Sequence, residues 1–158
     1  MKAVVVYDSY FGNTEKIAQA IGKAFGTAKT VNVVKVDLAK QEMLEGIDVL
    51  IVGSPTRAFR PTSSIIKFLR KIPPRGLSGV KVATFDTRLV MNDDMPRFLR
   101  FSVKFFGYAN KPILDLLMNK GGQETVPPEG FFVKDTEGPL QDGELERAAD
   151  WAKAITAS

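Results

Sequence analysis

The sequence predicts a single α/β domain over residues 1–158, with a doubly wound, five-stranded parallel sheet in a three-layer α/β/α arrangement. Three observations support this fold class. Runs rich in valine and isoleucine are continuous enough to be strands buried on both faces. Segments with helical spacing separate them, and alternating strands and helices form βαβ units with parallel neighbours. The length of 158 residues suits one domain with a core of its own.

Four strands are expected in the first 85 residues, and a fifth follows near residue 125. The first four are Ala3–Tyr7, Val31–Val36, Ile47–Gly53 and Val80–Phe85. The fifth consists of Glu124–Val126 and Phe131–Val133, separated by Pro127 and Pro128. Because proline has no N–H to donate to a neighbouring strand, we expect this strand to be split or bulged.

Helical spacing is found between and after these strands. The expected helices are Thr14–Phe25, Thr62–Lys71, Met95–Phe106, Ala109–Met118 and Asp142–Ile155. In the first, Ile17, Ile21 and Phe25 fall on one face, as a helix covering a sheet requires. Asp142 is predicted to be the N-cap of the last helix, because its carboxylate can accept from the first turn. Trp151 of that helix is predicted to belong to the core.

Doubly wound sheets bind ligands at the carboxyl ends of their strands. The loops expected at those ends are Asp8–Asn13, Ser54–Pro61 and Asp86–Asp94. The first brings together Ser9, Gly12, Asn13 and Thr14 just before a helix, where unpaired N–H groups and the helix dipole favour an anion. The pattern therefore predicts either an anion site or a helix cap without a ligand.

The composition limits the chemistry that the side chains can perform. The chain has no cysteine and no histidine, so it can form no disulfide and has no thiolate or imidazole for catalysis or metal binding. Any chemistry is therefore expected to come from a bound cofactor, with no catalytic residue and no metal site. The N-terminus does not resemble a signal peptide, and no apolar run is long enough to span a membrane. We expect a cytoplasmic protein.

Charge is distributed unevenly along the chain. The net charge is +4, yet residues 1–120 hold 19 Lys and Arg against 10 Asp and Glu, while residues 121–158 hold 3 against 8. The stretch Val49–Phe85 contains seven basic residues and no acidic one. Basic charge alone favours acidic partners, and no nucleic-acid recognition motif accompanies it, so nucleic acid is the least favoured ligand.

The stretch "VVYDSYFGNTEKIA" resembles the start of a flavodoxin-family protein, whose first loop carries a [TS]-x-T-G-x-T-type motif for the phosphate of FMN. Ser9, Gly12 and Thr14 match the motif, and Phe11 replaces its middle threonine. The likeness continues through "LIVGSPTRAFRPT", "VATFDTR" and "EGPLQDGELERAADWA", so it covers essentially the whole chain. It is to the short-chain type, and it implies the strand order 2-1-3-4-5.

The resemblance also implies a set of residues that bind FMN. The first loop would hold the phosphate with Ser9, Tyr10, Phe11, Gly12, Asn13 and Thr14. The loops after the third and fourth strands would enclose the flavin ring, with Pro55, Thr56, Arg57, Ala58 and Phe59 on one side and Asp86, Thr87 and Arg88 on the other. Phe59 is the expected stacking partner of the ring. The implied function is electron transfer to a redox partner protein.

The sequence departs from the family in ways that bear on this function. Electron-carrier flavodoxins are usually acidic and often enclose the flavin between tryptophan and tyrosine, and neither feature is present. Arg57 to Phe59 also lack the glycine that lets a flexible peptide reach the ring nitrogen. In the stretch "DMPRFLRFSVKFFGY", Phe98, Phe101 and Phe105 share a helix face that is expected to cover the sheet or the cofactor edge.

Two alternatives to an FMN electron carrier stay open at this point. One is an FMN-dependent reductase that takes electrons from NAD(P)H, and steady consumption of NAD(P)H would identify it. The other is a flavodoxin-type domain without cofactor that serves as a binding module, which a yellow colour of the pure protein would argue against. Because basic residues such as Arg57, Arg60, Arg97 and Arg100 are expected around the flavin edge, the partner is expected to be acidic.

Overall fold

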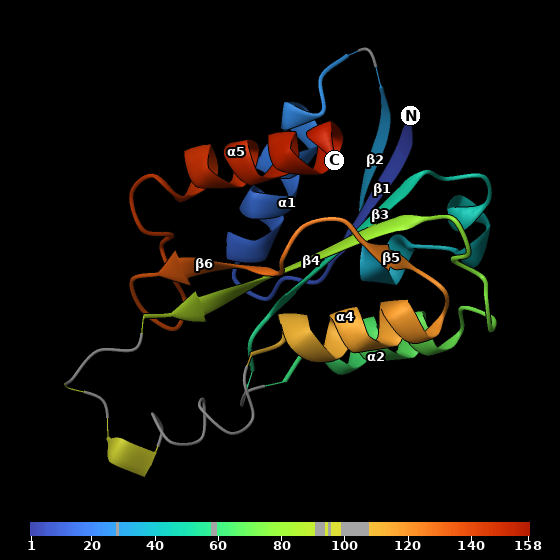
Figure 1. Cartoon of the computed structure of the whole chain (residues 1–158). Coiled ribbons are helices and arrows are strands. Elements are labelled where there is room, and N and C mark those ends of the chain that lie inside the picture. Colours follow the sequence, from blue (N-terminus) through green and yellow to red (C-terminus); the bar gives the residue numbers. More distant parts are fainter. Residues whose placement is uncertain (28, 58–59, 91–93, 95, 99–107) are drawn as a thin grey trace.

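The computed structural model describes residues 1–27, 29–57, 60–90, 94, 96–98 and 108–158 (Figure 1). Ala58 and Phe59 lie outside the described residues, as does most of the helix expected over Met95–Phe106. The expected stacking of Phe59, and the face expected to include Phe98, are therefore not part of the description that follows.

The centre of the fold is a parallel sheet with the order β2-β1-β3-β4-β5, as the sequence predicts. Its strands are β1 (Lys2–Tyr7), β2 (Thr30–Lys35), β3 (Val49–Pro55), β4 (Lys81–Leu89), β5 (Gln123–Glu124) and β6 (Glu129–Val133). β5 and β6 both pair with β4, one near its start and one near its end. The expected split of the fifth strand is thus confirmed.

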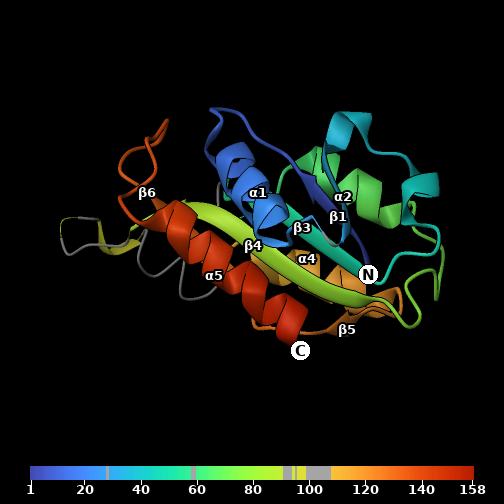
Figure 2. The same ribbon diagram turned by 90° about the horizontal axis from the view of Figure 1, so that it is seen from above.

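Helices cover both faces of the sheet (Figure 1). The α-helices are α1 (Asn13–Ala24), α2 (Ser63–Arg70), α4 (Asn110–Asn119) and α5 (Glu144–Ala157), and two short 3-10 helices are η1 (Val36–Leu38) and η2 (Gln41–Leu44). α1 and α5 lie side by side on one face, and α2 and α4 lie on the other (Figures 1 and 2). In the described part of the chain, no helix combines the length and the apolar character needed to cross a membrane.

The strands bury side chains on both faces, which explains their nearly continuous apolar sequence. In β1, Val4 and Val6 pack into the core beneath α2 and α4. Val5 and Tyr7, which alternate with them, pack into the core beneath α1 and α5. One sheet therefore separates two cores, and every α-helix described here contributes to one of them.

Three aromatic side chains join α5 to the end of the sheet. Phe85 of β4, Phe131 of β6 and Trp151 of α5 meet edge to face, with ring centroids 6.1 to 6.2 Å apart. The indole N–H of Trp151 donates to the carbonyl of Pro127 at 3.3 Å. Gly53 makes room for this cluster, because a Cβ there would lie 2.0 Å from Phe85. Trp151, predicted to belong to the core, is thus half-buried and packs against the edge of the core.

The prediction that β4 ends at Phe85 is wrong. The strand continues to Leu89, because β6 pairs with it in register from Phe85 opposite Glu129 to Leu89 opposite Val133. The segment Asp86–Arg88, predicted as a loop, is therefore part of a strand. The local sequence is polar, but the backbone N–H and C=O groups have a neighbouring strand to pair with.

The prediction that Asp142 caps the last helix is also wrong. The residue before the first turn of α5 is Gly143, with φ +84°, and no side chain of the described residues accepts from that turn as a cap. Asp142 points elsewhere, and its carboxylate lies 3.5 Å from the Nζ of Lys134. A positive φ at this position suits glycine, because it has no Cβ to clash with the backbone.

Arg147 of α5 ties the helix to β6. Its guanidinium pairs with Glu144 at 2.7 Å and with Glu129 at 3.0 Å, and it lies 4.7 Å from the ring centroid of Phe131. Glu144 also accepts from the backbone N–H of Phe132 at 2.7 Å. Burial alone would raise the pKa of Glu144, but the hydrogen bonds from Arg147 and Phe132 and the charge of Arg147 together lower it below the ordinary value of a glutamate.

We predict that Glu144 makes the protein less stable in acid. A carboxyl whose pKa is lowered by folding stabilises the folded state above its unfolded pKa, and this contribution is lost as the pH falls through the folded pKa. Glu144→Gln should therefore flatten the decline of the free energy of unfolding below about pH 5. Urea unfolding followed by circular dichroism between pH 7 and pH 3 measures it. Glu146→Gln on the exposed side of α5 is the control, and equal profiles for the two variants would contradict the prediction.

Candidate functional site

Three segments meet at the carboxyl ends of β1, β3 and β4. The first is the loop between β1 and α1, which is folded against the sheet. The backbone N–H of Asp8 donates to the carbonyl of Gly53 at 3.1 Å. The carboxylate of Asp8 accepts from the backbone of Ser9 at 2.9 Å, and the hydroxyl of Ser9 accepts from the backbone of Gly12 at 3.1 Å. These bonds fix the path of the chain into α1.

Helix α1 begins with an open first turn. Gly12 precedes it with φ +87°, and no side chain in the described residues caps the turn. A Cβ on Gly12 would meet no atom within 4 Å, so the space beside the helix end is open. The first N–H groups of a helix are strong donors that need a partner, and the helix dipole favours a negative one. The first turn thus has the donors, and Gly12 the open approach, that a phosphate group requires.

Thr14 connects this loop to β4. Its side chain is 1% exposed, and its hydroxyl oxygen lies 2.8 Å from that of Thr87. Each hydroxyl has one proton, so one proton lies between the two oxygens and the other can be donated to a third group. Two residues predicted from separate segments are thereby brought together.

Asn13 connects the first loop to the segment that follows β6. Its side-chain amide donates to the carbonyl of Glu137 at 3.1 Å, which ties α1 to the loop between β6 and α5. Gly138 next to it leaves the room that this contact needs, because a Cβ there would lie 2.6 Å from the side-chain oxygen of Asn13. The contribution of Asn13 to anion binding stays a prediction.

The second segment follows β3 and is held to its neighbours by backbone bonds. Pro55 ends the strand, and the N–H of Thr56 donates to the carbonyl of Thr87 at 3.0 Å. The hydroxyl of Thr56 accepts from the backbone of Ala109 at 3.2 Å, at the start of α4. Arg57 and Arg60 exchange two backbone hydrogen bonds of 2.9 Å, which hold these two residues side by side.

The side chain of Arg57 lies against the first loop. Its guanidinium carbon is 4.8 Å from the ring centroid of Tyr10 and 5.9 Å from that of Phe11. Both rings are exposed, at 56% and 46%, so the contact is a surface cation–π interaction. The sequence predicted Arg57 beside the flavin ring, and the structure places its charge next to the loop predicted to hold the phosphate.

The third segment contains a buried ion pair. Asp86 is fully buried, and its carboxylate accepts from the Nε of Arg88 at 2.5 Å and from its Nη2 at 2.7 Å. The backbone N–H of Asn110 donates to the same carboxylate at 3.2 Å. Burial raises the pKa of Asp86, and the bonds and charge of Arg88 oppose this rise. A two-point pair holds the guanidinium in one orientation.

Two residues that sequence reasoning missed complete the surroundings of Arg88. Its guanidinium carbon lies 3.4 Å from the ring centroid of Tyr108. On β6, a Cβ at Gly130 would lie 2.4 Å from the same carbon. Gly130 follows the two prolines that split the fifth strand, and a glycine within a strand is a known signal for close approach. No comparable signal in the sequence indicated Tyr108.

The ion pair of Asp86 and Arg88 lowers the net positive charge expected at the carboxyl ends of the strands. The charge of Arg88 is balanced at contact distance by Asp86, so it adds little net field to its surroundings. Arg57 and Arg60 are exposed, and neither pairs with a carboxylate of the described residues. The unbalanced positive charge therefore comes from the second segment.

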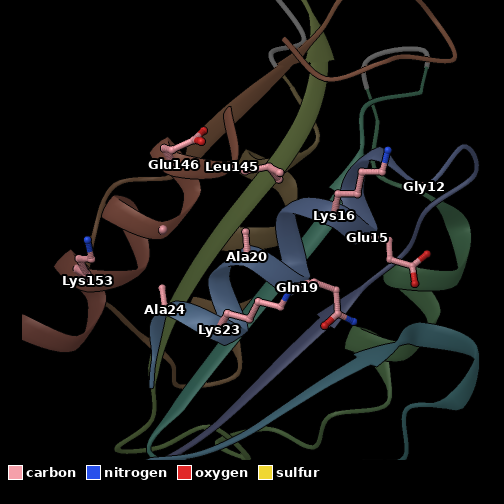
Figure 3. Close-up of a pocket in the computed structure, with 11 residues that line it drawn as sticks. Gly12, Glu15, Lys16, Gln19, Ala20, Lys23, Ala24, Leu145, Glu146 and Lys153 are labelled. Atoms are coloured by element: carbon pink, nitrogen blue, oxygen red, sulfur yellow. The ribbon is translucent and has the colours of Figure 1, made fainter. Parts of the chain in front are cut away.

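A groove of about 780 Å³ lies elsewhere, between α1 and α5 (Figure 3). Among the predicted site residues that the structure describes, only Gly12 lines it. Small and aliphatic side chains alternate with charges of both signs, and the residues are Glu15, Lys16, Gln19, Ala20, Lys23, Ala24, Leu145, Glu146, Ala149 and Lys153. The groove is thus on the outside of one helix layer and adjoins the first segment at Gly12.

We predict that Asp86 and Arg88 contribute to the free energy of unfolding as a pair, so that loss of one partner costs more than replacement of both. Asp86→Asn leaves the charge of Arg88 largely buried without its partner and should cost about 3 kcal/mol of unfolding free energy. Replacing both residues, as Asp86→Leu with Arg88→Met, should recover most of this loss, because a well-packed apolar pair avoids the desolvation cost. Urea unfolding of Asp86→Leu, Arg88→Met and the double variant measures the coupling. Additive losses would show that the two side chains do not depend on each other.

Comparison with solved structures identifies close matches to the fold. Flavodoxin 1 from Bacillus cereus, in its oxidised form, is 20% identical, covers 99% of this chain and 98% of its own, and has a TM-score of 0.76. A flavodoxin from the domain Archaea is 21% identical, with coverage of 99% and 97% and a TM-score of 0.76. Rubredoxin oxygen:oxidoreductase from Desulfovibrio gigas matches over 99% of this chain and 35% of its own, at 20% identity and a TM-score of 0.74.

The sequence itself gives a more direct assignment. No curated protein matches the chain. The family described as "Flavodoxin domain" does match it, over residues 4–124. This span runs from within β1 to the end of β5 and includes all three segments of the candidate site. The chain therefore belongs to the flavodoxin family.

Proposed function

We propose that this protein binds FMN at the ends of β1, β3 and β4 and carries electrons to a redox partner protein. The observation on which the proposal rests is the open first turn of α1, where Gly12 leaves the N–H donors without a side-chain cap from the described residues. Membership of the flavodoxin family supports a flavin as the ligand and electron transfer as the role.

Each segment would contribute differently to holding the cofactor. Gly12 and Thr14 would bind the phosphate, with the Thr14 hydroxyl oriented by Thr87. Pro55 and Thr56 would border the ring from the end of β3, while the Asp86–Arg88 pair gives the end of β4 a fixed, nearly neutral surface. Bound FMN would supply the redox chemistry, since the sequence has neither histidine nor cysteine.

One titration tests the proposal and separates it from its two alternatives. Purified protein saturated with FMN should show the visible bands of a bound flavin. A cofactor-free binding module would leave the spectrum that of free FMN, which would overturn the proposal. If flavin binds and the protein alone then consumes NAD(P)H steadily, the protein is a reductase and the carrier role is wrong.

We predict that Thr14 discriminates between FMN and riboflavin. Thr14→Val removes a donor to a charged acceptor and should weaken FMN binding by about 1.5–3 kcal/mol, roughly ten-fold or more. Riboflavin has no phosphate and should lose nothing. Quenching of flavin fluorescence gives both dissociation constants.

Thr87→Val is the matched control for this change. It removes the buried hydroxyl partner of Thr14 but not the donor itself, so the preference for FMN over riboflavin should persist. Equal losses for FMN and riboflavin in Thr14→Val would mean that the phosphate binds elsewhere.

We predict that the charge of Arg57 raises the reduction potential of the bound flavin. Reduction adds negative charge to the flavin, and a nearby positive charge favours it. Arg57→Glu should therefore lower the potential, and lower it further at low salt, because exposed charges are screened by ions. Lys23→Glu in the groove of Figure 3 changes the net charge equally and should shift the potential less. Equal shifts in a spectroelectrochemical titration would place Arg57 too far from the ring to matter.

A further inference from the structure

The loop after β3 and helix α2 expose positive charge without any negative charge. We define the α2 basic stripe as Arg57, Arg60, Lys67, Arg70 and Lys71. All five are exposed, and they lie in the stretch Val49–Phe85 that has no acidic residue. Within the described residues, none of them pairs with a carboxylate.

The stripe begins at the candidate cofactor edge and runs away from it. Arg57 and Arg60 belong to the loop at the carboxyl end of β3. α2 then runs back along the sheet (Figure 1), and Lys67, Arg70 and Lys71 are spaced three and four residues apart, on one side of the helix. A partner that covers the stripe would also reach the ends of β3 and β4.

Helix stability explains only part of this arrangement. Lys67 and Arg70 lie in the last turn of α2, where the helix dipole favours cations. Arg57 and Arg60 precede the N-cap Thr62, at the end where the dipole disfavours them. Lys67 and Lys71 are also four residues apart, a spacing at which like charges repel. Repulsion within the α2 basic stripe therefore destabilises the folded protein locally, and the favourable interaction of Lys67 and Arg70 with the dipole of α2 offsets only part of this effect.

The surfaces of α1, α4 and α5 carry charges of both signs. In the layer of α1 and α5, Lys153 pairs with Asp150 at 3.1 Å, and the groove lined by Lys23 also contains Glu146. On α4, next to α2, Lys111 pairs with Asp115 at 3.4 Å. The α2 basic stripe differs from these surfaces because its five cations lie within residues 57–71 with no acidic residue among them, and it leads to the candidate flavin edge.

We propose that the α2 basic stripe is the docking surface for an acidic redox partner protein. The proposal rests on the proposed function, because the partner must place its own redox centre near the flavin edge. A row of unpaired cations that starts at that edge steers an acidic surface towards the protein and aligns it there. A nucleic acid or a membrane would have no reason to be drawn to the cofactor edge.

Two variants with the same net charge test the location. Lys67→Glu with Lys71→Glu reverses the stripe, and Lys23→Glu with Lys153→Glu reverses two exposed lysines of the opposite layer (Figure 3). The reaction is stopped-flow reduction of the FMN-loaded protein by a reduced acidic [2Fe–2S] ferredoxin, from about 10 mM to about 1 M salt. At low salt the stripe variant should react roughly ten-fold more slowly than the wild type, and the control at most about two-fold. Equal losses would show a general charge effect and overturn the proposal.

A second measurement does not depend on the flavin. Oxidised ferredoxin should bind the FMN-free protein by calorimetry, and the stripe variant should lose this binding while the control keeps it. Lys67→Gln with Lys71→Gln, a milder change, should show about half of the loss if the double reversal disturbs α2. Failure of the wild type to take up FMN would overturn the proposed function, whereas the calorimetric comparison would still decide the stripe.

Two competing ligands complete the test. A single-stranded DNA 20-mer and vesicles of phosphatidylglycerol in phosphatidylcholine are titrated under the same conditions. The proposal is overturned if the DNA or the vesicles bind more tightly than ferredoxin at about 0.15 M salt and the stripe variant loses that binding. The surface would then be assigned to nucleic acid or to a membrane. A preference for ferredoxin supports it.

Discussion

The pairing of β6 with the last part of β4 determines the geometry of the whole candidate site. β4 would otherwise have no partner on its outer side beyond Val82, where β5 stops. β6 continues the edge from Phe85 to Leu89 and keeps Asp86 buried in the sheet. Thr87 is then held within reach of Thr14, and the backbone of Gly130 lies where Arg88 needs space. A strand of five residues thus places side chains from three segments.

The same pairing connects the site to helix α5. Arg147 reaches from α5 to Glu129 and lies over Phe131, so β6 is fixed on its outer side as well. The aromatic cluster of Phe85, Phe131 and Trp151 fills the space beneath. Helix α5 is the last element of the chain. It nevertheless helps to fix the position of the end of β4, to which the first loop is hydrogen-bonded.

Much of this fold follows from local sequence. Valine-rich runs such as that of β1 and the helical spacing of α1 need no knowledge of distant partners, and Pro127 and Pro128 indicated the break between β5 and β6. The extension of β4 could not be predicted in this way. The stretch Asp86–Arg88 is polar enough to be a loop, and it is a strand because β3 pairs with Asp86 and Thr87 on one side and β6 pairs with all three residues on the other.

The candidate site was predictable in its location but not in its internal contacts. The topology alone places the ends of β1, β3 and β4 together. That Arg88 is balanced by Asp86, while Arg57 turns towards Tyr10, depends on side-chain geometry that no spacing reveals. The start of α5 could not be predicted from the residue type alone either. Asp142 is a suitable capping residue, but the next residue, a glycine with positive φ, occupies the N-cap position instead.

The position of Trp151 has a practical consequence for spectroscopy. It is the only tryptophan of the chain, and it contacts Phe85, Phe131 and the carbonyl of Pro127. Its emission therefore reports how α5 sits on the end of the sheet. The layer of α2 and α4 lies on the other face and contains no indole, so its loosening would leave this fluorescence unchanged. Intrinsic fluorescence thus monitors one half of the molecule, and a label on α2 or α4 is needed to observe the other.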